Sequence, residues 1–290
     1  MNQLPSLGFI GLGDMGAPMV KNLLAAGYAV RGFDLNAERV AAGVAGGMIG
    51  GSDTPDVVAQ SDMVLTSLPS SQAFFTVAEN EILPNLRAGQ IVIDLGTSVV
   101  PAFRALAEVM AERGVALVDA PVSGGPGGVE RRQLYMFVGG SEEVVARCMP
   151  ILAAIGGDAR ITHCGPVGSG QIVKGVNQLM MGLGNAAYLE ALSFGVNLGV
   201  DAAVLQQALG NSGRWRADLH ATAGQIVEGR GDEVGVKFRE LPYFIEACQA
   251  AGLRLPLTEL LYRFCDQGER VVIDDHRPAP SFWRELTGRP

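Results

Sequence analysis

The sequence has few of the residues that build metal sites and disulfide frameworks. Its 290 residues include four cysteines and three histidines, and neither set is clustered or contains a CxxC pair. This spacing predicts no metal centre and no disulfide framework, and it favours a reducing cytoplasm as the location. Positive charge is also scarce. The formal net charge of −8 argues against nucleic acid or an anionic membrane surface as the partner.

Long apolar runs are missing as well. No stretch of about 18 apolar residues lacks polar breaks, and the apolar run near the N-terminus follows no basic segment, so we expect neither a membrane span nor a signal peptide. The chain instead has 48 % hydrophobic and 18 % charged residues, which is typical of a globular protein. Its length leaves room for two modest domains.

The N-terminal residues carry a dinucleotide-binding pattern. An apolar stretch at 7–10 predicts a buried strand, and a GxGxxG turn leads from it into a helix that ends near Gly27. Such a turn presents backbone N–H groups to a pyrophosphate. The residues expected to contact the cofactor here are Gly11, Leu12, Gly13, Asp14, Met15 and Gly16.

A second predicted strand, over 28–33, ends in Asp34. A carboxylate at this place accepts hydrogen bonds from the adenosine ribose and repels a 2′-phosphate. NAD is therefore the expected cofactor and NADP the alternative. The alternative depends on Arg31 and Arg39, which are either solvated surface residues or partners of a 2′-phosphate.

Strands and helices then alternate up to about residue 165. The pattern predicts strands at 63–67, 91–94, 116–119, 135–140 and 159–162, and helices at 54–60 (capped by Thr54), 100–113 and 142–155. This alternation is typical of a doubly wound, mainly parallel sheet, which binds ligands at the carboxyl ends of its strands. Leu68, Pro69, Thr97 and the segment DAPVSGGPGG at 119–128 follow such ends, so we expect them to share a crevice with the glycine turn.

From residue 166 onward the pattern is helical, which predicts one domain at 1–165 and a second, all-α domain at 166–290. The stretch 168–199 contains two formal charges, Lys174 and Glu190, and its apolar residues recur on all sides of the helix. A helix of this kind is expected to be buried on every face. Lys174, Asn177 and Gln178 share one stripe of it. The lysine either reaches solvent with its tip or serves as a catalytic amine.

Three segments carry a family resemblance: FIGLGDMGAPM at 9–19, DAPVSGGPGG at 119–128 and GSGQIVKGVNQ at 168–178. They resemble the signature segments of the β-hydroxyacid dehydrogenase family, whose members include 3-hydroxyisobutyrate dehydrogenase and tartronate semialdehyde reductase. The resemblance covers nearly the whole chain. It implies an N-terminal Rossmann domain joined by a long helix to an all-α domain, and a homodimer or homotetramer.

The resemblance also implies roles for single residues. Lys174 would be the catalytic acid and base. The substrate carboxylate would be bound by Ser123, Gly124 and Gly125, with Asn177 and Gln178 beside them, and the nicotinamide side would be lined by Thr97, Leu68 and Pro69. The expected substrate is thus a small anionic hydroxy acid or its semialdehyde.

The chain departs from the family pattern at two places. Arg132 stands where the family usually has glycine, so the turn beyond the substrate segment is expected to be reshaped. Arg239 stands where the family has a lysine near the cofactor. Arginine keeps the positive charge of lysine, but its guanidinium is a planar fork of donors and not a single ammonium. Lys237 is the alternative residue for this role.

Several functions compete for this pattern. Within the family, the alternatives to a 3-hydroxyisobutyrate-like substrate are tartronate semialdehyde and sulfolactaldehyde. Outside it, the alternatives are a catalytically inactive dinucleotide-binding scaffold or sensor and an imine reductase. The presence of Lys174 with Ser123 and Asn177 favours an NAD-dependent dehydrogenase that interconverts a short 3-hydroxy acid and its semialdehyde.

Overall fold

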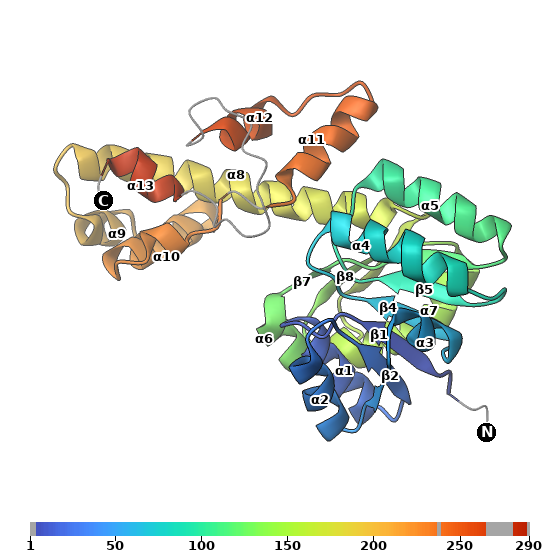
Figure 1. Cartoon of the computed structure of the whole chain (residues 1–290). Coiled ribbons are helices and arrows are strands. Elements are labelled where there is room, and N and C mark those ends of the chain that lie inside the picture. Colours follow the sequence, from blue (N-terminus) through green and yellow to red (C-terminus); the bar gives the residue numbers. More distant parts are fainter. Residues whose placement is uncertain (1–3, 237–238, 265–280, 289–290) are drawn as a thin grey trace. The chain divides into compact units, whose positions relative to one another are not determined.

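A computed structural model describes residues 4–236, 239–264 and 281–288 of the chain (Figure 1). The chain divides into two compact units, Met1–Lys174 and Gly175–Pro290. The division falls inside the longest described helix, α8 (Ser169–Asn197), so the first turns of α8 belong to the first unit. A domain boundary between residues 165 and 166 stays a prediction.

The first unit is built on a sheet whose described strands follow the order β3-β2-β1-β4-β5-β6-β8-β7, with β9 beside β8. The strands from β3 to β6 in this order are parallel, β8 is antiparallel to β6 and β7, and β9 is parallel to β8. The predicted doubly wound, mainly parallel sheet is therefore confirmed. The strands are β1 (Leu7–Ile10), β2 (Val30–Phe33), β3 (Ile49–Gly50), β4 (Met63–Thr66), β5 (Ile91–Asp94), β6 (Ala116–Asp119), β7 (Val122–Ser123), β8 (Tyr135–Gly139) and β9 (Ile161–Gly165).

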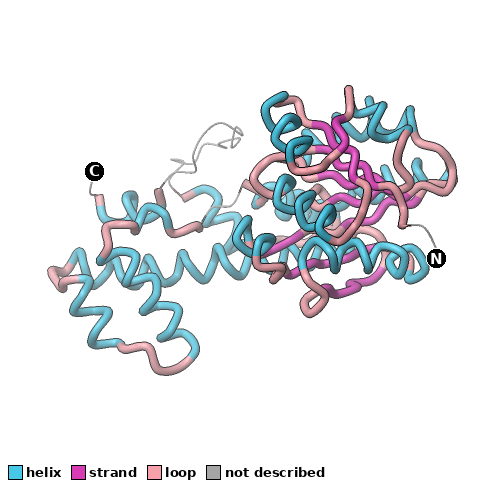
Figure 2. The backbone as a smooth tube through the Cα atoms, turned by 90° about the horizontal axis from the view of Figure 1, so that it is seen from below, coloured by secondary structure: helices cyan, strands magenta, loops and turns pink. Residues whose placement is uncertain are grey.

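Helices cover both faces of the sheet (Figure 2). The central strands β1, β4 and β5 are therefore buried throughout. One face packs against α1 (Gly16–Ala25), α2 (Ala37–Ala45), α6 (Gly125–Glu130) and α7 (Glu142–Gly156). We call it the α1/α7 face. The other packs against α3 (Thr54–Ala59), α4 (Ser71–Val77) with the turns that follow it (Ala78–Ile82, Leu83–Asn85), and α5 (Val100–Glu112). We call it the α5 face.

One local prediction differs from the structure. The predicted cap of the helix at 54–60 was wrong: Asp53 is the cap, with its carboxylate accepting from the Asp56 N–H at 2.7 Å, and Thr54 is the first helical residue. Both side chains are good caps and proline is accepted in either position of the first turn, so the local pattern did not separate them. The segment at 119–128 contains β7, and α6 begins within it.

The second unit is helical, as predicted. It contains the rest of α8, α9 (Ala202–Leu209), α10 (Arg214–Val227), a short turn at Gly231–Glu233, α11 (Leu241–Ala250), α12 (Pro256–Arg263) and α13 (Phe282–Thr287). Two glycines of α8 admit neighbouring side chains: a Cβ on Gly175 would lie 3.0 Å from the Phe244 ring, and one on Gly195 would lie 2.7 Å from Leu205. A Cβ on Gly184 would meet nothing within 4 Å, so close approach does not explain that glycine.

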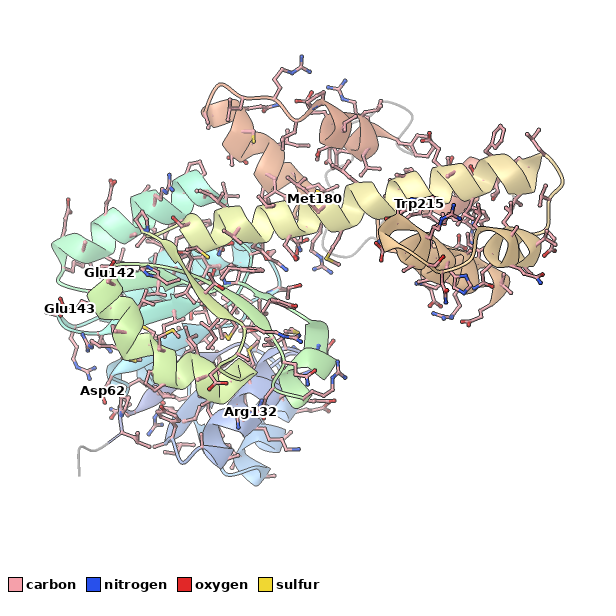
Figure 3. All side chains as sticks on the ribbon, turned by 180° about the vertical axis from the view of Figure 1, so that it is seen from behind. Asp62, Arg132, Glu142, Glu143, Met180 and Trp215 are labelled. Atoms are coloured by element: carbon pink, nitrogen blue, oxygen red, sulfur yellow. The ribbon has the colours of Figure 1, made fainter. Side chains whose placement is uncertain are left out.

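The expectation that α8 is buried on every face was wrong. Met180, labelled on this helix in Figure 3, is 66 % exposed, and Val176 and Phe194 are 58 % and 72 % exposed. One chain therefore leaves apolar side chains of α8 uncovered. In the described part of the chain no single helix is long and apolar enough to cross a membrane; α8 and α9 meet that criterion only together, with a 120° bend between them.

Candidate active site

The three glycines of the first turn have different surroundings. A Cβ on Gly16 would lie 2.0 Å from the Gly11 carbonyl oxygen, and one on Gly11 would lie 2.3 Å from the Ser67 carbonyl oxygen. The packing of the chain itself therefore requires these two glycines. A Cβ on Gly13 would meet no protein atom nearer than Arg39 Nη1, at 3.8 Å. Gly13 thus leaves open space beside the turn, as the predicted close approach of a pyrophosphate requires.

The start of α1 and the end of β2 complete this side of the site. Met15 at the start of α1 makes no side-chain cap hydrogen bond, so no cap side chain occupies the N–H groups of the first turn. Asp34 Oδ2 accepts from the Leu12 N–H at 2.7 Å and lies 3.5 Å from Arg39 Nη1. The carboxylate that was predicted to contact the ribose is therefore fixed against the glycine turn. Asp14 is exposed on the same turn.

The different surroundings of Gly13 and Gly16 yield a prediction. Gly13→Ala should leave the melting temperature unchanged but raise the dissociation constant of the cofactor by about 5- to 150-fold, the equivalent of ~1–3 kcal/mol of steric overlap with the ligand. Gly16→Ala should lower the melting temperature, because its methyl group overlaps a carbonyl oxygen of the protein. Thermal unfolding and cofactor titration check both variants. Normal cofactor affinity in the Gly13 variant would show that no ligand approaches this turn closely.

The ends of β4 and β5 lie beside the glycine turn. A Cβ on Gly11 would lie 3.1 Å from Leu68 Cδ2, and one on Gly96 would lie 3.7 Å from the Leu68 carbonyl oxygen. The segment that carries Thr97 is therefore next to the strand end that carries Leu68. Pro69 follows Leu68 directly, and Thr97 is half-buried. The structure thus brings the predicted cofactor residues of the first unit to one edge of the sheet.

Asp94, at the end of β5, was not predicted as part of the site. Its side chain is fully buried and accepts from Thr66 Oγ1 at 2.9 Å, from the Gly96 N–H at 3.1 Å and from Ser98 Oγ at 2.9 Å. Burial raises the pKa of Asp94 to about 6, although these hydrogen bonds act in the opposite direction. The carboxylate holds the 96–98 segment in place.

Asp119, at the end of β6, anchors the start of α8. Its two carboxylate oxygens accept from the Gly168 N–H at 2.7 Å and the Gln171 N–H at 2.9 Å. Burial raises the pKa of Asp119. The buried side chain of Gln171 in turn accepts from the Ser98 N–H at 3.0 Å and donates to the Gly96 carbonyl at 3.0 Å. These contacts tie the first turn of α8 to the ends of both β5 and β6.

Lys174 lies one turn after Gln171 in α8. It is only 8 % exposed, and its Nζ donates to the Val122 carbonyl oxygen at 2.8 Å. Of the two alternatives for this lysine, the structure therefore does not support the one in which its tip reaches solvent. Ser123 directly follows Val122, so the structure brings the lysine amine to the predicted carboxylate-binding segment. Gly124 and Gly125 have φ angles of 134° and 61°, and a Cβ on Gly125 would meet nothing within 4 Å.

The remaining predicted site residues belong to the second unit. Asn177 is half-buried and its Nδ2 lies 3.5 Å from Met181 Sδ. Gln178 is 7 % exposed, and its Oε1 has no hydrogen-bond partner among the residues that the structure describes. Arg239 is exposed just before α11, and Lys237 lies outside the described residues.

Arg132, in the turn beyond the substrate segment, has a left-handed backbone conformation. Its φ angle is 53°, a value that glycine adopts more readily. The side chain, labelled in Figure 3, donates from Nη2 to the Ala153 carbonyl at 3.0 Å. Arginine therefore occupies a left-handed backbone conformation here, and the reshaping of this turn relative to the family stays a prediction.

Comparisons with known proteins match the whole described fold. A family profile described as the NAD binding domain of 6-phosphogluconate dehydrogenase matches residues 6–165. A second, described as "NAD-binding of NADP-dependent 3-hydroxyisobutyrate dehydrogenase", matches residues 168–276. The two descriptions establish NAD(P) binding and do not choose between the cofactors.

Named relatives agree with the profiles. The chain is 34 % identical to a 2-(hydroxymethyl)glutarate dehydrogenase of Eubacterium barkeri, over 99 % of this chain and 98 % of that protein. It is 32 % identical to an NAD-dependent L-serine dehydrogenase of Pseudomonas aeruginosa, over 90 % and 92 %. A solved structure of Mycobacterium tuberculosis 3-hydroxyisobutyrate dehydrogenase with L-serine is similar with a TM-score of 0.78, 26 % identity and 99 % coverage of both chains. The chain therefore belongs to the β-hydroxyacid dehydrogenase family of NAD(P)-dependent oxidoreductases.

Proposed function

We propose that the protein interconverts a short 3-hydroxy acid and its semialdehyde with NAD, as a 3-hydroxyisobutyrate dehydrogenase does, and that Lys174 is its acid and base. The observation that carries the proposal is the position of the lysine amine, which is buried and held 2.8 Å from the Val122 carbonyl, beside Ser123. Burying an ammonium group costs folding free energy, so a lysine at this position is better explained by a role in the reaction than by packing alone. The names of the relatives support the substrate class.

The residues of the chain divide the work of the reaction. Bound NAD supplies the hydride chemistry at the substrate carbon. Lys174 takes the hydroxyl proton during oxidation and returns it during reduction, and its bond to Val122 fixes where the amine points. The Ser123 hydroxyl and the N–H groups of Gly124 and Gly125 donate to the substrate carboxylate. A protein of net charge −8 needs such local donors to hold an anion.

Turnover with a panel of substrates tests this function. The panel contains 3-hydroxyisobutyrate, 3-hydroxypropanoate and L-serine, each as the acid and as the methyl ester. We expect only the acids to be oxidised, because the ester lacks the negative charge that the Ser123–Gly125 segment binds. Equal use of acid and ester would contradict the carboxylate role. Cofactor binding without turnover of any hydroxy acid would favour the inactive scaffold or sensor.

We propose NAD as the preferred cofactor because Asp34 directly follows β2, and a carboxylate at the end of this strand repels a 2′-phosphate. Asp34→Ser should lower the ratio of kcat/KM with NAD to kcat/KM with NADP by roughly 10- to 100-fold, since it removes the repulsion and releases Arg39 from its carboxylate partner. The double variant Asp34→Ser, Arg39→Ala is the control and should gain less NADP activity. A wild-type enzyme that prefers NADP would contradict the proposal.

We also propose that the protein is a cytoplasmic homodimer or homotetramer. The exposed apolar side chains of α8 and α12, such as Met180, Phe194 and Leu260, support a second copy as the cover, because apolar patches of this kind mark association surfaces. The described cysteines 148, 164 and 248 are free thiols, in keeping with a reducing compartment.

A further inference from the structure

Three side chains form a row across the strands beside the predicted substrate segment. Ser123 on β7 pairs directly with Tyr135 on β8 in antiparallel register. On the other side of β8, Met136 pairs with Ile161 in parallel register, so Arg160 lies next to Tyr135. The Arg160 guanidinium is stacked over the Tyr135 ring, 4.7 Å from its centroid. The row therefore runs from Ser123 through Tyr135 to Arg160.

This row lies on the sheet face that carries the lysine. Val122 and Met136 pack into the core of the α1/α7 face, and because side chains alternate along a strand, Ser123 and Tyr135 point to the α5 face. Asp119 points there too: its neighbour Val118 belongs to the α1/α7 core, and its carboxylate binds the start of α8. Lys174 reaches Val122 from that helix. The amine, Ser123 and the Tyr135–Arg160 pair thus share one face.

The chemistry of the pair suits an anion. Arg160 donates to the Gln133 carbonyl at 3.4 Å, and among the described residues no carboxylate forms an ion pair with it. The guanidinium retains further N–H donors in a fork that matches a carboxylate. Tyr135 is 49 % exposed and adds a hydroxyl group. The protein has eight more negative than positive charges, so an arginine without an ion-pair carboxylate in the described part of the chain, beside the predicted carboxylate-binding segment, points to an anionic ligand.

We propose that Tyr135 and Arg160 form a subsite for a second carboxylate of the substrate, which makes the preferred substrate a dicarboxylic 3-hydroxy acid. The inference rests on the proposed function, in which Ser123–Gly125 bind the first carboxylate. Neighbouring strands are about 4.8 Å apart, so a side arm of two or three carbons spans the distance from Ser123 to a guanidinium stacked over the next strand.

The test uses three substrates that differ in one group. They are 3-hydroxyisobutyrate and two derivatives in which its methyl group is lengthened to a side arm ending in a carboxylate or in the matching neutral amide. The wild-type enzyme should have a kcat/KM about five- to tenfold higher for the carboxylate than for the amide, a value between that of an exposed ion pair and that of a charge-assisted hydrogen bond. Arg160→Gln should abolish this preference, mainly through KM, and Arg160→Lys should restore part of it.

Arg147→Gln is the matched control, because it removes the same charge from the exposed surface of α7, which covers the opposite face of the sheet. It should keep the full preference for the carboxylate. Turnover of 3-hydroxyisobutyrate without any preference between carboxylate and amide would overturn the subsite alone, as would a preference that survives in Arg160→Gln. Failure to oxidise all three substrates would instead overturn the proposed function, and the subsite with it.

Discussion

Lys174→Ala is expected to lower kcat by about 10²- to 10⁴-fold, the usual loss when a positioned acid or base is removed. The lysine amine is buried and directed at the segment that carries Ser123, and no other described lysine occupies this place. The dissociation constant of NADH, measured by fluorescence titration, should hardly change, because in the proposed mechanism the amine acts on the substrate proton and the pyrophosphate is bound by the glycine turn. Wild-type turnover in this variant would show that the acid–base assignment is wrong.

Lys174→Arg separates acid–base chemistry from simple attraction of an anion. Arginine keeps a positive charge near the substrate but does not lose its proton at neutral pH. If Lys174 moves a proton, the arginine variant should be almost as slow as the alanine variant while its KM for the hydroxy acid stays nearer to that of wild type. A variant that keeps most of the wild-type kcat would mean that the charge alone is required.

The parts of the site that local patterns encode were predicted well. GxGxxG, the alternating strands and the charge-poor helix are all short-range signals, and they led to the sheet, the glycine turn and Asp34. In the structure, Asp34 contacts the turn that it was paired with in the prediction. Lys174 stood out because it is one of two charges in its stretch. The ligand roles of these residues stay predictions.

The parts that depend on distant contacts were missed. Asp94 and Asp119 end strands in ordinary-looking segments, and their importance lies in bonds to residues such as Gln171, which is 52 positions from Asp119. No helical or strand period encodes such a pairing. A polar Gln171 one turn before Lys174, in a largely apolar helix, was the available signal. The burial of α8 was overestimated for a related reason. An apolar sequence pattern does not say what would cover the helix, the core of the same chain or a second molecule.

Asp119 is expected to be the positioning residue of the lysine helix, and its loss should affect both stability and rate. Asp119→Ala leaves the Gly168 and Gln171 N–H groups without their acceptors, at a cost of about 1–3 kcal/mol each in the free energy of unfolding. Asp119→Asn keeps the shape and one acceptor oxygen, so it should lose less. Because burial raises the pKa of Asp119, its ionised form is favoured less in the folded than in the unfolded protein.

The pH dependence of stability gives this assignment a second measurement. At a pH below the ordinary pKa of an aspartate, the carboxyl group is protonated in both the folded and the unfolded protein, so burial carries no charge penalty. As the pH rises from this ordinary pKa through the raised pKa of the folded protein, the penalty of the buried charge lowers the free energy of unfolding. Asp94 acts in the same direction up to about pH 6. Asp119→Asn has no such charge, so its free energy of unfolding should fall less steeply than that of wild type over this range.

The rate distinguishes positioning from a purely structural role. In Asp119→Asn, kcat should fall roughly tenfold or more, since a displacement of about 1 Å at a catalytic group costs up to ~10² in rate, while the dissociation constant of the cofactor stays close to wild type. Asp62→Asn is the control. Asp62, labelled in Figure 3, accepts hydrogen bonds from the Ser6 N–H at 2.9 Å, from Ser6 Oγ at 2.8 Å and from Arg87 Nη2 at 3.2 Å. It lies just before β4, at the opposite edge of the sheet from the carboxyl ends of the strands. This variant should lose some stability and keep its kcat. If Asp119→Asn folds and turns over at the wild-type rate, the start of α8 does not need this carboxylate to place Lys174.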